Sequence, residues 1–155
     1  MGKTRSLVAS PGCHGRTGNV LCDPVSYLCL ISGIARYNVQ HSPVYLAAMI
    51  TINILGNFLH FTSDMQKAVS LELRPGQLIT DKLFAICRHP NYLGESLIYG
   101  SFVGLGDSWL MAGYLITYVV AYWWPNIYWK EKSMSRYESW KAYCMETALL
   151  VPFVW

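Results

Sequence analysis

Residues 43–61, PVYLAAMITINILGNFLHF, run for 19 residues without a lysine, arginine, aspartate or glutamate. A helix of this length covers most of the hydrocarbon core of a bilayer, which is about 30 Å thick. Pro43 suits the first turn of such a helix, where its missing N–H is not needed. Two further apolar runs follow, over residues 92–106 and 109–129. The second run carries Trp and Tyr near its ends, which is typical of side chains at a membrane surface. The pattern predicts transmembrane helices.

Composition agrees with a membrane environment. Only 14% of the 155 residues are charged, against about 25% in ordinary soluble domains, and 53% are hydrophobic. We therefore predict an all-α fold, a polytopic transmembrane helical bundle of three to four membrane helices plus a C-terminal amphipathic segment. Residues 1–24, rich in Gly, Ser and Arg, are expected to form a flexible N-terminus, and residues 25–155 a single transmembrane domain. Residues 24–37 are apolar but too short to be identified as a span, and an interfacial or re-entrant segment is the alternative.

Basic residues set the expected topology. They gather in residues 63–92 and again after residue 129, whereas the turn at 106–108 has none and carries Asp107. Two apolar runs separate the basic regions, so both are expected on one side of the membrane, which the positive-inside rule makes cytosolic. The partner expected from this composition is a lipid bilayer. A net charge of +3 without a long basic run does not favour nucleic acid.

Two further sequence patterns do not identify a function. Five cysteines, odd in number and without a CxxC spacing, favour neither a disulfide framework nor a metal site. Gly2 and Ser6 fit the pattern for N-myristoylation, for which a plain basic N-terminus is the alternative.

A polar stripe runs through and beyond the first apolar segment. Its members, spaced by four, three, four and three residues, are Asn53, Asn57, His60, Asp64 and Lys67. On a helix this spacing places them on one face. Because polar groups facing acyl chains are costly, the stripe must face other helices or a water-filled space. Hydrogen bonding between helices is one interpretation. The change to Asp and Lys toward the basic end favours the other, a ligand cleft open to the cytosolic side.

The stretch RHPNYLGE, residues 88–95, combines several anion- and ribose-binding features. Pro90 predicts a helix that begins near His89, whose free N–H groups attract an anion, and Arg88 adds donors. Asn91 and Glu95, four residues apart, share one face of that helix. An amide and a carboxylate suit ribose hydroxyls or a carboxamide. Together these features favour a nucleotide cofactor, and a proline-started helix with a structurally paired glutamate is the alternative.

Two further features frame this stretch. Gly94 has no side chain, which permits close approach by a neighbouring helix or a flat ligand. Beyond residue 129, Lys130, Lys132 and Arg136 fit either of two roles, holding phosphates or facing lipid head groups.

RHPNYLGE resembles the signature of a membrane enzyme superfamily. It includes steroid 5α-reductases, sterol double-bond reductases and a related uncharacterised reductase-like family, and isoprenylcysteine and phospholipid methyltransferases share its C-terminal architecture. HFTSD at 60–64, the linker and signature at 73–95, and the closing segment at 130–155 resemble the reductases in the same order. The resemblance covers about 100 of the 155 residues, from about Asn57 to the end. Glutamate after the signature glycine is typical of the reductases, whereas the methyltransferases more often carry an apolar or aromatic residue there.

The resemblance implies a membrane-embedded NADPH-dependent reductase of a carbon–carbon double bond in a hydrophobic small-molecule substrate that is steroid- or lipid-like. It also implies a multi-pass protein of the endoplasmic reticulum or another internal membrane. The alternatives are an S-adenosylmethionine-dependent methyltransferase acting on a prenylcysteine or lipid, and a non-catalytic shortened member. The candidate cofactor-binding residues are Asp64, Arg74, Arg88, His89, Asn91, Glu95, His60, Asn57, Lys130 and Arg136. Among them, His60 stands where the steroid reductases have an amide.

The catalytic acid is not identified by the sequence. Reduction of a conjugated double bond needs a group that polarises the carbonyl or protonates the second carbon. In the steroid reductases such groups come from N-terminal helices, and residues 1–50 resemble none of these. Tyr27, Tyr37 and Tyr45 are candidates only because they lie upstream and carry a phenol.

Overall fold

The computed structural model describes residues 40–106 and 108–152. Its elements are α2 (Pro43–Leu73), the 3-10 turn η1 (Lys82–Ala85), α3 (Pro90–Gly106), α4 (Trp109–Tyr118), the π-helical turn η2 (Val119–Trp123), α5 (Trp124–Met134) and α6 (Trp140–Glu146). Within these ranges there is no strand, and one backbone bridge joins Cys87 to Ala148. The predicted all-α fold is thus confirmed for this part of the chain. The predictions for residues 1–24 and 24–37, with Tyr27 and Tyr37, lie outside the described residues.

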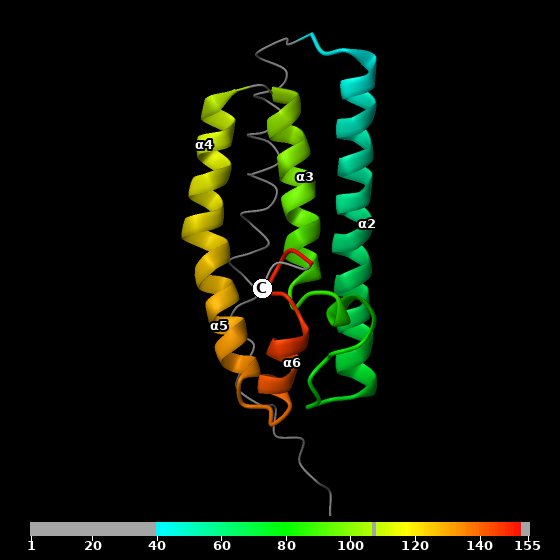
Figure 1. Ribbon diagram of the computed structural model, residues 1–155, viewed down its shortest axis with the longest axis vertical. Helices are drawn as coiled ribbons and strands as arrows, with labels where there is room; N and C mark the ends of the chain where they lie inside the picture. The colour runs from blue at the N-terminus through cyan, green and yellow to red at the C-terminus, as the bar shows by residue number, and fades with distance from the viewer. Residues whose placement is uncertain (1–39, 107, 153–155) are drawn as a thin grey trace, which may run out of the picture.

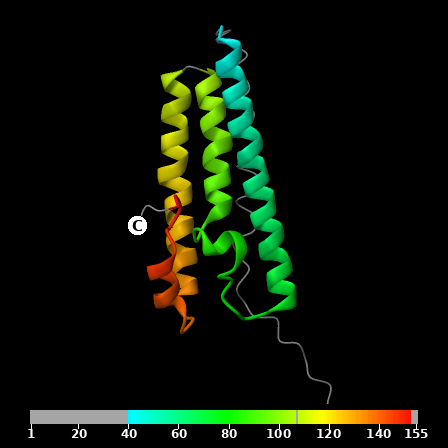
Figure 2. The ribbon, with the colours of Figure 1, turned by 45° about the vertical axis from the view of Figure 1, so that its right-hand side comes forward.

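Three helical columns stand side by side (Figures 1 and 2). α4, η2 and α5 follow one another without a break and form one column, and α3 lies between this column and α2. The segment between α2 and α3 and the segment around α6 lie at the same end of the columns. The two basic regions of the sequence therefore meet at this end, which we call the basal end. The side of a membrane that it faces stays a prediction.

α2 begins where the proline pattern predicts. The Ser42 hydroxyl accepts a hydrogen bond from the Tyr45 N–H at 3.3 Å, which caps the helix ahead of Pro43. The helix continues for 31 residues, well past the apolar run, and ends at Leu73, with Arg74 as its C-cap. Gly76 follows with φ +79°, a left-handed conformation that suits a glycine in a turn.

One helix of the described ranges, α2, is long and apolar enough to cross a membrane by length and composition. α3 has 17 residues and the third column is divided by η2, which leaves α4 with 10 residues. The bundle of three to four spans is therefore a prediction for α3 and for the third column.

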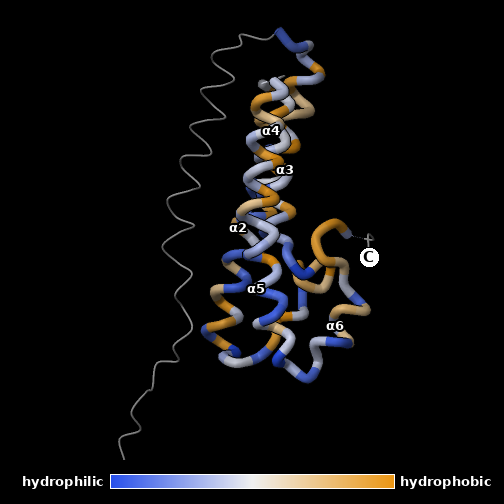
Figure 3. The backbone as a smooth tube through the Cα atoms, turned by 90° about the vertical axis from the view of Figure 1, so that its left-hand side faces the viewer, coloured by the Kyte–Doolittle hydropathy of each residue, from blue (hydrophilic) through white to orange (hydrophobic). Residues whose placement is uncertain are grey.

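Apolar side chains point both inward and outward. A buried cluster between α3 and the third column contains Tyr92, Ile98, Tyr99, Met111, Trp123 and Ile127. The outer face of α2 is also apolar, and Ile54, Phe58 and Phe61 are each more than 60% exposed. Around α6 and the lower part of α5, hydrophilic residues are frequent, whereas the upper parts of the columns are mostly neutral or apolar (Figure 3). An exposed apolar surface of this extent is typical of one that contacts a membrane or another protein.

Candidate functional site

A cavity of about 430 Å³, which we call the polar cavity, opens between the three columns. Each column contributes to its wall, and the wall combines carboxylates, amines, amides and aromatic rings. The lining residues are His60, Asp64, Lys67, Ala68, Leu71, Asn91, Tyr92, Glu95, Tyr118, Tyr122, Trp123, Asn126 and Lys130. A second cavity of about 240 Å³, the basal cavity, shares Lys67, Leu71, Asn91 and Lys130 with it. The two cavities are therefore neighbours along one cleft.

The basal cavity is rich in cationic groups. Besides Lys67 and Lys130, its wall includes Arg88, His89 and Arg136. Five of the ten candidate cofactor residues line the polar cavity, and Arg88, His89 and Arg136 line only the basal one. The cleft thus brings together eight residues that are spread over more than 70 positions of the sequence.

His60 sits between two carboxylates in the polar cavity. Its Nε2 lies 3.7 Å from Asp64 Oδ2, one turn along α2, and its Nδ1 lies 3.7 Å from Glu95 Oε1 on α3. The same Nδ1 is 3.4 Å from the carbonyl oxygen of Asn91. Glu95 is 14% exposed at its side chain, so this carboxylate faces the cleft and not lipid. The i, i+4 pair of Asn91 and Glu95 lines the cavity, as the sequence predicts.

Lys130 projects between both cavities toward Tyr92. Its ammonium donates a hydrogen bond of 3.0 Å to the Tyr92 hydroxyl and lies 4.3 Å from the centre of the ring. Burial and the nearby charge of Lys67 lower the pKa of Lys130 to about 8, against the opposing influence of Glu95 and Asp64. An amine that titrates near neutral pH in a cleft marks a candidate functional group.

Trp123 forms part of the wall beside Tyr92. The two ring centres are 5.4 Å apart, and Trp123 is 4% exposed. Its indole N–H is a buried donor without a hydrogen-bond partner among the described residues. Buried donors are nearly always satisfied, and an orphaned one costs about 1–3 kcal/mol, so this indole N–H beside the cavity is a candidate partner for a bound group.

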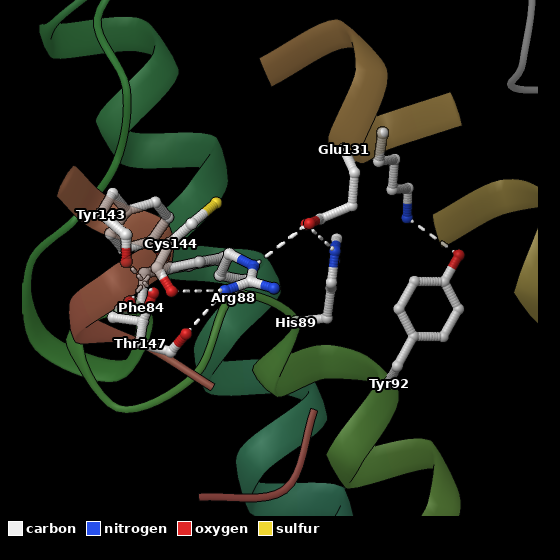
Figure 4. Close-up of polar contacts among 9 residues, drawn as sticks. Phe84, Arg88, His89, Tyr92, Glu131, Tyr143, Cys144 and Thr147 are labelled. Carbon is white, nitrogen blue, oxygen red and sulfur yellow. Dashed lines mark hydrogen bonds and ion pairs between the residues drawn. The ribbon is translucent and has the colours of Figure 1, made fainter. Parts of the chain in front are cut away.

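Arg88 and His89 are both directed to Glu131 on α5 (Figure 4). His89 Nε2 lies 2.8 Å from Glu131 Oε1, and Arg88 Nε lies 3.2 Å from Oε2. Arg88 also donates to the carbonyl oxygen of Thr147 at 2.6 Å, which ties the segment after α6 to the start of α3. The expected anion site at this helix start is therefore largely occupied by a carboxylate of the protein itself.

Two candidate residues lie away from the cleft. Arg74 pairs with Asp81 at 2.9 Å and lines neither cavity, and this guanidinium lowers the pKa of the exposed Asp81 carboxyl. Asn57 donates to the backbone and side-chain oxygens of Asn53, each at 2.9 Å. Asn53 in turn donates to the Ser101 hydroxyl on α3 at 2.9 Å. In the upper part of α2 the polar stripe therefore connects helices, whereas lower down it lines a cleft.

Several cavity residues were not singled out by the sequence analysis. They are mainly the aromatic and amide groups of the third column: Tyr118, Tyr122, Trp123 and Asn126. Tyr118, Tyr122 and Asn126 follow each other at four-residue spacing, which places them on one helix face. The same spacing is present in the sequence, but in an apolar run these aromatic residues were interpreted as side chains at a membrane surface.

Comparison with known proteins gives a family and no activity. The family described as "Protein of unknown function (DUF1295)" matches residues 25–147. The chain belongs to this family, which is associated with the steroid 5-alpha reductase-like membrane family. Neither a curated protein nor a solved structure matches the chain.

Proposed function

We propose that the chain is a membrane-embedded NADPH-dependent reductase of a carbon–carbon double bond in a hydrophobic, steroid- or lipid-like substrate. The observation that carries the proposal is the convergence of Asp64, Asn91 and Glu95 on one cavity. These three residues match the cofactor contacts of the reductases that the sequence resembles. They come from two helices, so their convergence is a property of the fold and not of one local motif.

The chemistry of the two cavities supports a dinucleotide with charged and uncharged parts. Lys67, Lys130 and Arg136 would hold phosphates on the basal side. Asn91 and Glu95 would bind hydroxyl or carboxamide groups in the polar cavity, between aromatic walls that suit a planar ring. When bound, the cofactor supplies the hydride. The protein would orient it and keep water from the reacting carbon.

The membrane setting is part of the proposal. Exposed apolar side chains cover α2 and also the third column, where Trp109, Ile116, Val120 and Trp124 are each more than 60% exposed. The 17 residues of α3 reach the lower limit of about 17–25 for a span. We therefore place residues 43–61 of α2, the helix α3 and residues 109–129 of the third column across an internal membrane, with the basal end, including Lys130, in the cytosol. A hydrophobic substrate would then enter the polar cavity from the bilayer.

One observation favours a second candidate, methyl transfer from S-adenosylmethionine. A sulfonium is a cation, and the polar cavity offers it the carboxylates of Asp64 and Glu95 beside the rings of Tyr122 and Trp123. Lys67 and Lys130 in the same wall oppose a cation, and for that reason the reductase is preferred.

Ligand-induced stabilisation separates these candidates. The full chain in mild detergent is heated alone, with NADPH and with S-adenosylmethionine, because a bound ligand raises stability in proportion to the logarithm of its concentration. We expect NADPH to raise the Tm and Glu95→Gln to weaken this rise. The matched control is Glu72→Gln, which changes an exposed carboxylate on α2 that lines neither cavity. A response to S-adenosylmethionine alone would establish the methyltransferase candidate instead, and no response to either ligand would leave a non-catalytic member.

A further inference from the structure

We infer that the Tyr92 hydroxyl is the proton donor of the proposed reduction, and that it acts on the carbonyl oxygen of a conjugated ketone. This inference rests on the proposed function and deepens it, because it names the polar group that the substrate must carry. It also moves the acid away from the upstream tyrosines and into the signature RHPNYLGE itself.

The Tyr92 phenol lies in the wall of the polar cavity. Tyr92 lies two residues from the start of α3, and its side chain is 4% exposed yet lines the polar cavity. The ring is held by Trp123 at 5.4 Å and by His89 at 5.8 Å between centres. It thus has a fixed position next to Asn91 and near Glu95, the residues proposed to bind the cofactor. A catalytic acid needs such a fixed position more than it needs exposure.

The partner of the phenol is an ammonium. Lys130 donates to the Tyr92 oxygen at 3.0 Å. A phenol oxygen can accept from an ammonium and donate its own proton at the same time. The adjacent positive charge favours the phenolate that remains after proton transfer. Lys130 is therefore a positioning residue, and the charged groups around it are Lys67 and Asp64 on α2 and Glu95 on α3.

A second donor in the same wall has no partner among the described residues. The buried indole N–H of Trp123 can hold the carbonyl oxygen alongside the Tyr92 hydroxyl. A ketone oxygen has two lone pairs and can accept from both donors. In the proposed complex the two donors would share an oxygen that gains negative charge during the reaction.

When bound, the cofactor would supply a hydride to the carbon β to the carbonyl, and the electron pair of the double bond would move toward the carbonyl oxygen. The Tyr92 O–H bond breaks and its proton passes to that oxygen, which gives an enol. The enol becomes the saturated ketone by taking a solvent proton at the α carbon and releasing its hydroxyl proton. Lys130 returns a proton to the phenolate, and solvent restores Lys130.

The test compares Tyr92→Phe, which keeps the ring, with Tyr128→Phe, which changes an exposed tyrosine of α5 outside both cavities. Oxidation of NADPH is followed with hydrophobic α,β-unsaturated ketones and with the corresponding non-conjugated alkenes. We expect turnover of the enones alone, a loss of about 100-fold or more in kcat for Tyr92→Phe, and no loss for Tyr128→Phe. NADPH stabilisation should be equal in the two variants. Activity of Tyr92→Phe within a few-fold of the wild type would overturn the inference and leave the reductase proposal in place.

A binding measurement keeps the inference testable without turnover. Quenching of tryptophan fluorescence reports the affinity for a saturated hydrophobic ketone, and the matching hydrocarbon serves as control ligand. We expect Tyr92→Phe to weaken ketone binding at least about tenfold and to leave hydrocarbon binding unchanged. Equal ketone affinity in Tyr92→Phe and wild type would overturn the inference. If NADPH neither binds nor is oxidised while ketone binding depends on Tyr92, the reductase proposal fails and the oxygen site stands.

Two substitutions test the role of Lys130 separately. Lys130→Met should lower the enone reduction rate, and Lys130→Arg should restore part of it because a cation is present again. The rate with Lys130→Arg should persist at alkaline pH, where the wild-type amine, with a pKa of about 8, loses its charge. A purely structural lysine would give the same pH profile in both proteins.

Discussion

Gly56 and Gly94 face each other where α2 crosses α3, and neither position has room for a side chain. A methyl group at Gly94 would lie 2.7 Å from the Gly56 carbonyl oxygen and 2.6 Å from the His60 backbone nitrogen. A methyl group at Gly56 would lie 2.8 Å from the Gly94 carbonyl oxygen. Because this contact is between backbones, it fixes the distance from His60 on α2 to Glu95 on α3.

Gly94→Ala should therefore separate the two helices and disturb the polar cavity. We expect a loss of about 1–3 kcal/mol in unfolding free energy, as for other overpacked sites, together with a loss of NADPH stabilisation. Gly100→Ala on the same helix is the matched control, because nothing lies within 4 Å of the methyl group that it adds. Thermal unfolding of both variants checks the prediction, and equal Tm values would contradict the close contact.

The sequence predicted those parts of the site that depend on local geometry. Pro43 and Pro90 mark the starts of α2 and α3, and the spacing of Asn91 and Glu95 places both on one face toward the cavity. These conclusions need only the helix period and the missing N–H of proline. Gly94 was expected to permit close approach, and the structure identifies the neighbour as α2.

Ion pairs between residues far apart in the sequence could not be predicted from the sequence. Arg88 meets Glu131, 43 residues away, and a single sequence gives no means of pairing these two charges. Arg74 was a candidate cofactor-binding residue, but it pairs with Asp81 at the surface. The apolar run covers only residues 43–61 of α2, whose more polar continuation to Leu73 lines the cleft.

Glu131 on α5 binds Arg88 and His89 at the start of α3, and Arg88 in turn binds the segment after α6, so removal of the Glu131 charge should loosen all three segments. Glu131→Gln leaves the partly buried Arg88 without its carboxylate and weakens the bond to His89. We expect a loss of about 2 kcal/mol in stability, typical of hydrogen bonds to charged groups, and faster proteolysis after α6. Glu138→Gln, an exposed position on the segment before α6, is the control. Limited proteolysis with mass spectrometry locates the cut, and unchanged cleavage near residues 147–152 would rule out this role of Glu131.

His89 should make the fold sensitive to acid. Burial lowers the pKa of His89 below its ordinary 6.5, against the opposing influence of Glu131, with Lys130 and Arg88 adding to the lowering. As pH falls below 6.5, the imidazole of the unfolded chain is protonated before that of the folded chain. Proton binding therefore stabilises the unfolded state relative to the folded state. Stability should therefore fall between pH 7 and pH 5.5. The Tm of His89→Gln should vary less with pH than that of the wild type, whereas His41→Gln, at the opposite end of α2, should keep the full slope.

The buried charge of Lys130 should lower the unfolding free energy at neutral pH. Its pKa of about 8, against an ordinary 10.5, means that the folded state holds its charge against a burial penalty. Below pH 8 the Lys130 amine is protonated in both the folded and the unfolded state, so the folded state bears the full cost of burying the charge. Between pH 8 and 10.5 the unfolded state binds more protons, so stability rises with pH.

Replacing this amine by an apolar chain of similar length should then stabilise the protein while impairing its proposed function. We expect Lys130→Met to raise the unfolding free energy at pH 7 by on the order of 1 kcal/mol, and the gain to shrink toward pH 10. Lys132→Met, an exposed position two residues on, should change stability little at either pH. Thermal unfolding at the two pH values makes the comparison. A destabilised Lys130→Met at pH 7 would mean that the hydrogen bond and ring contact with Tyr92 outweigh the burial penalty, and that this lysine is held for structure and not for chemistry.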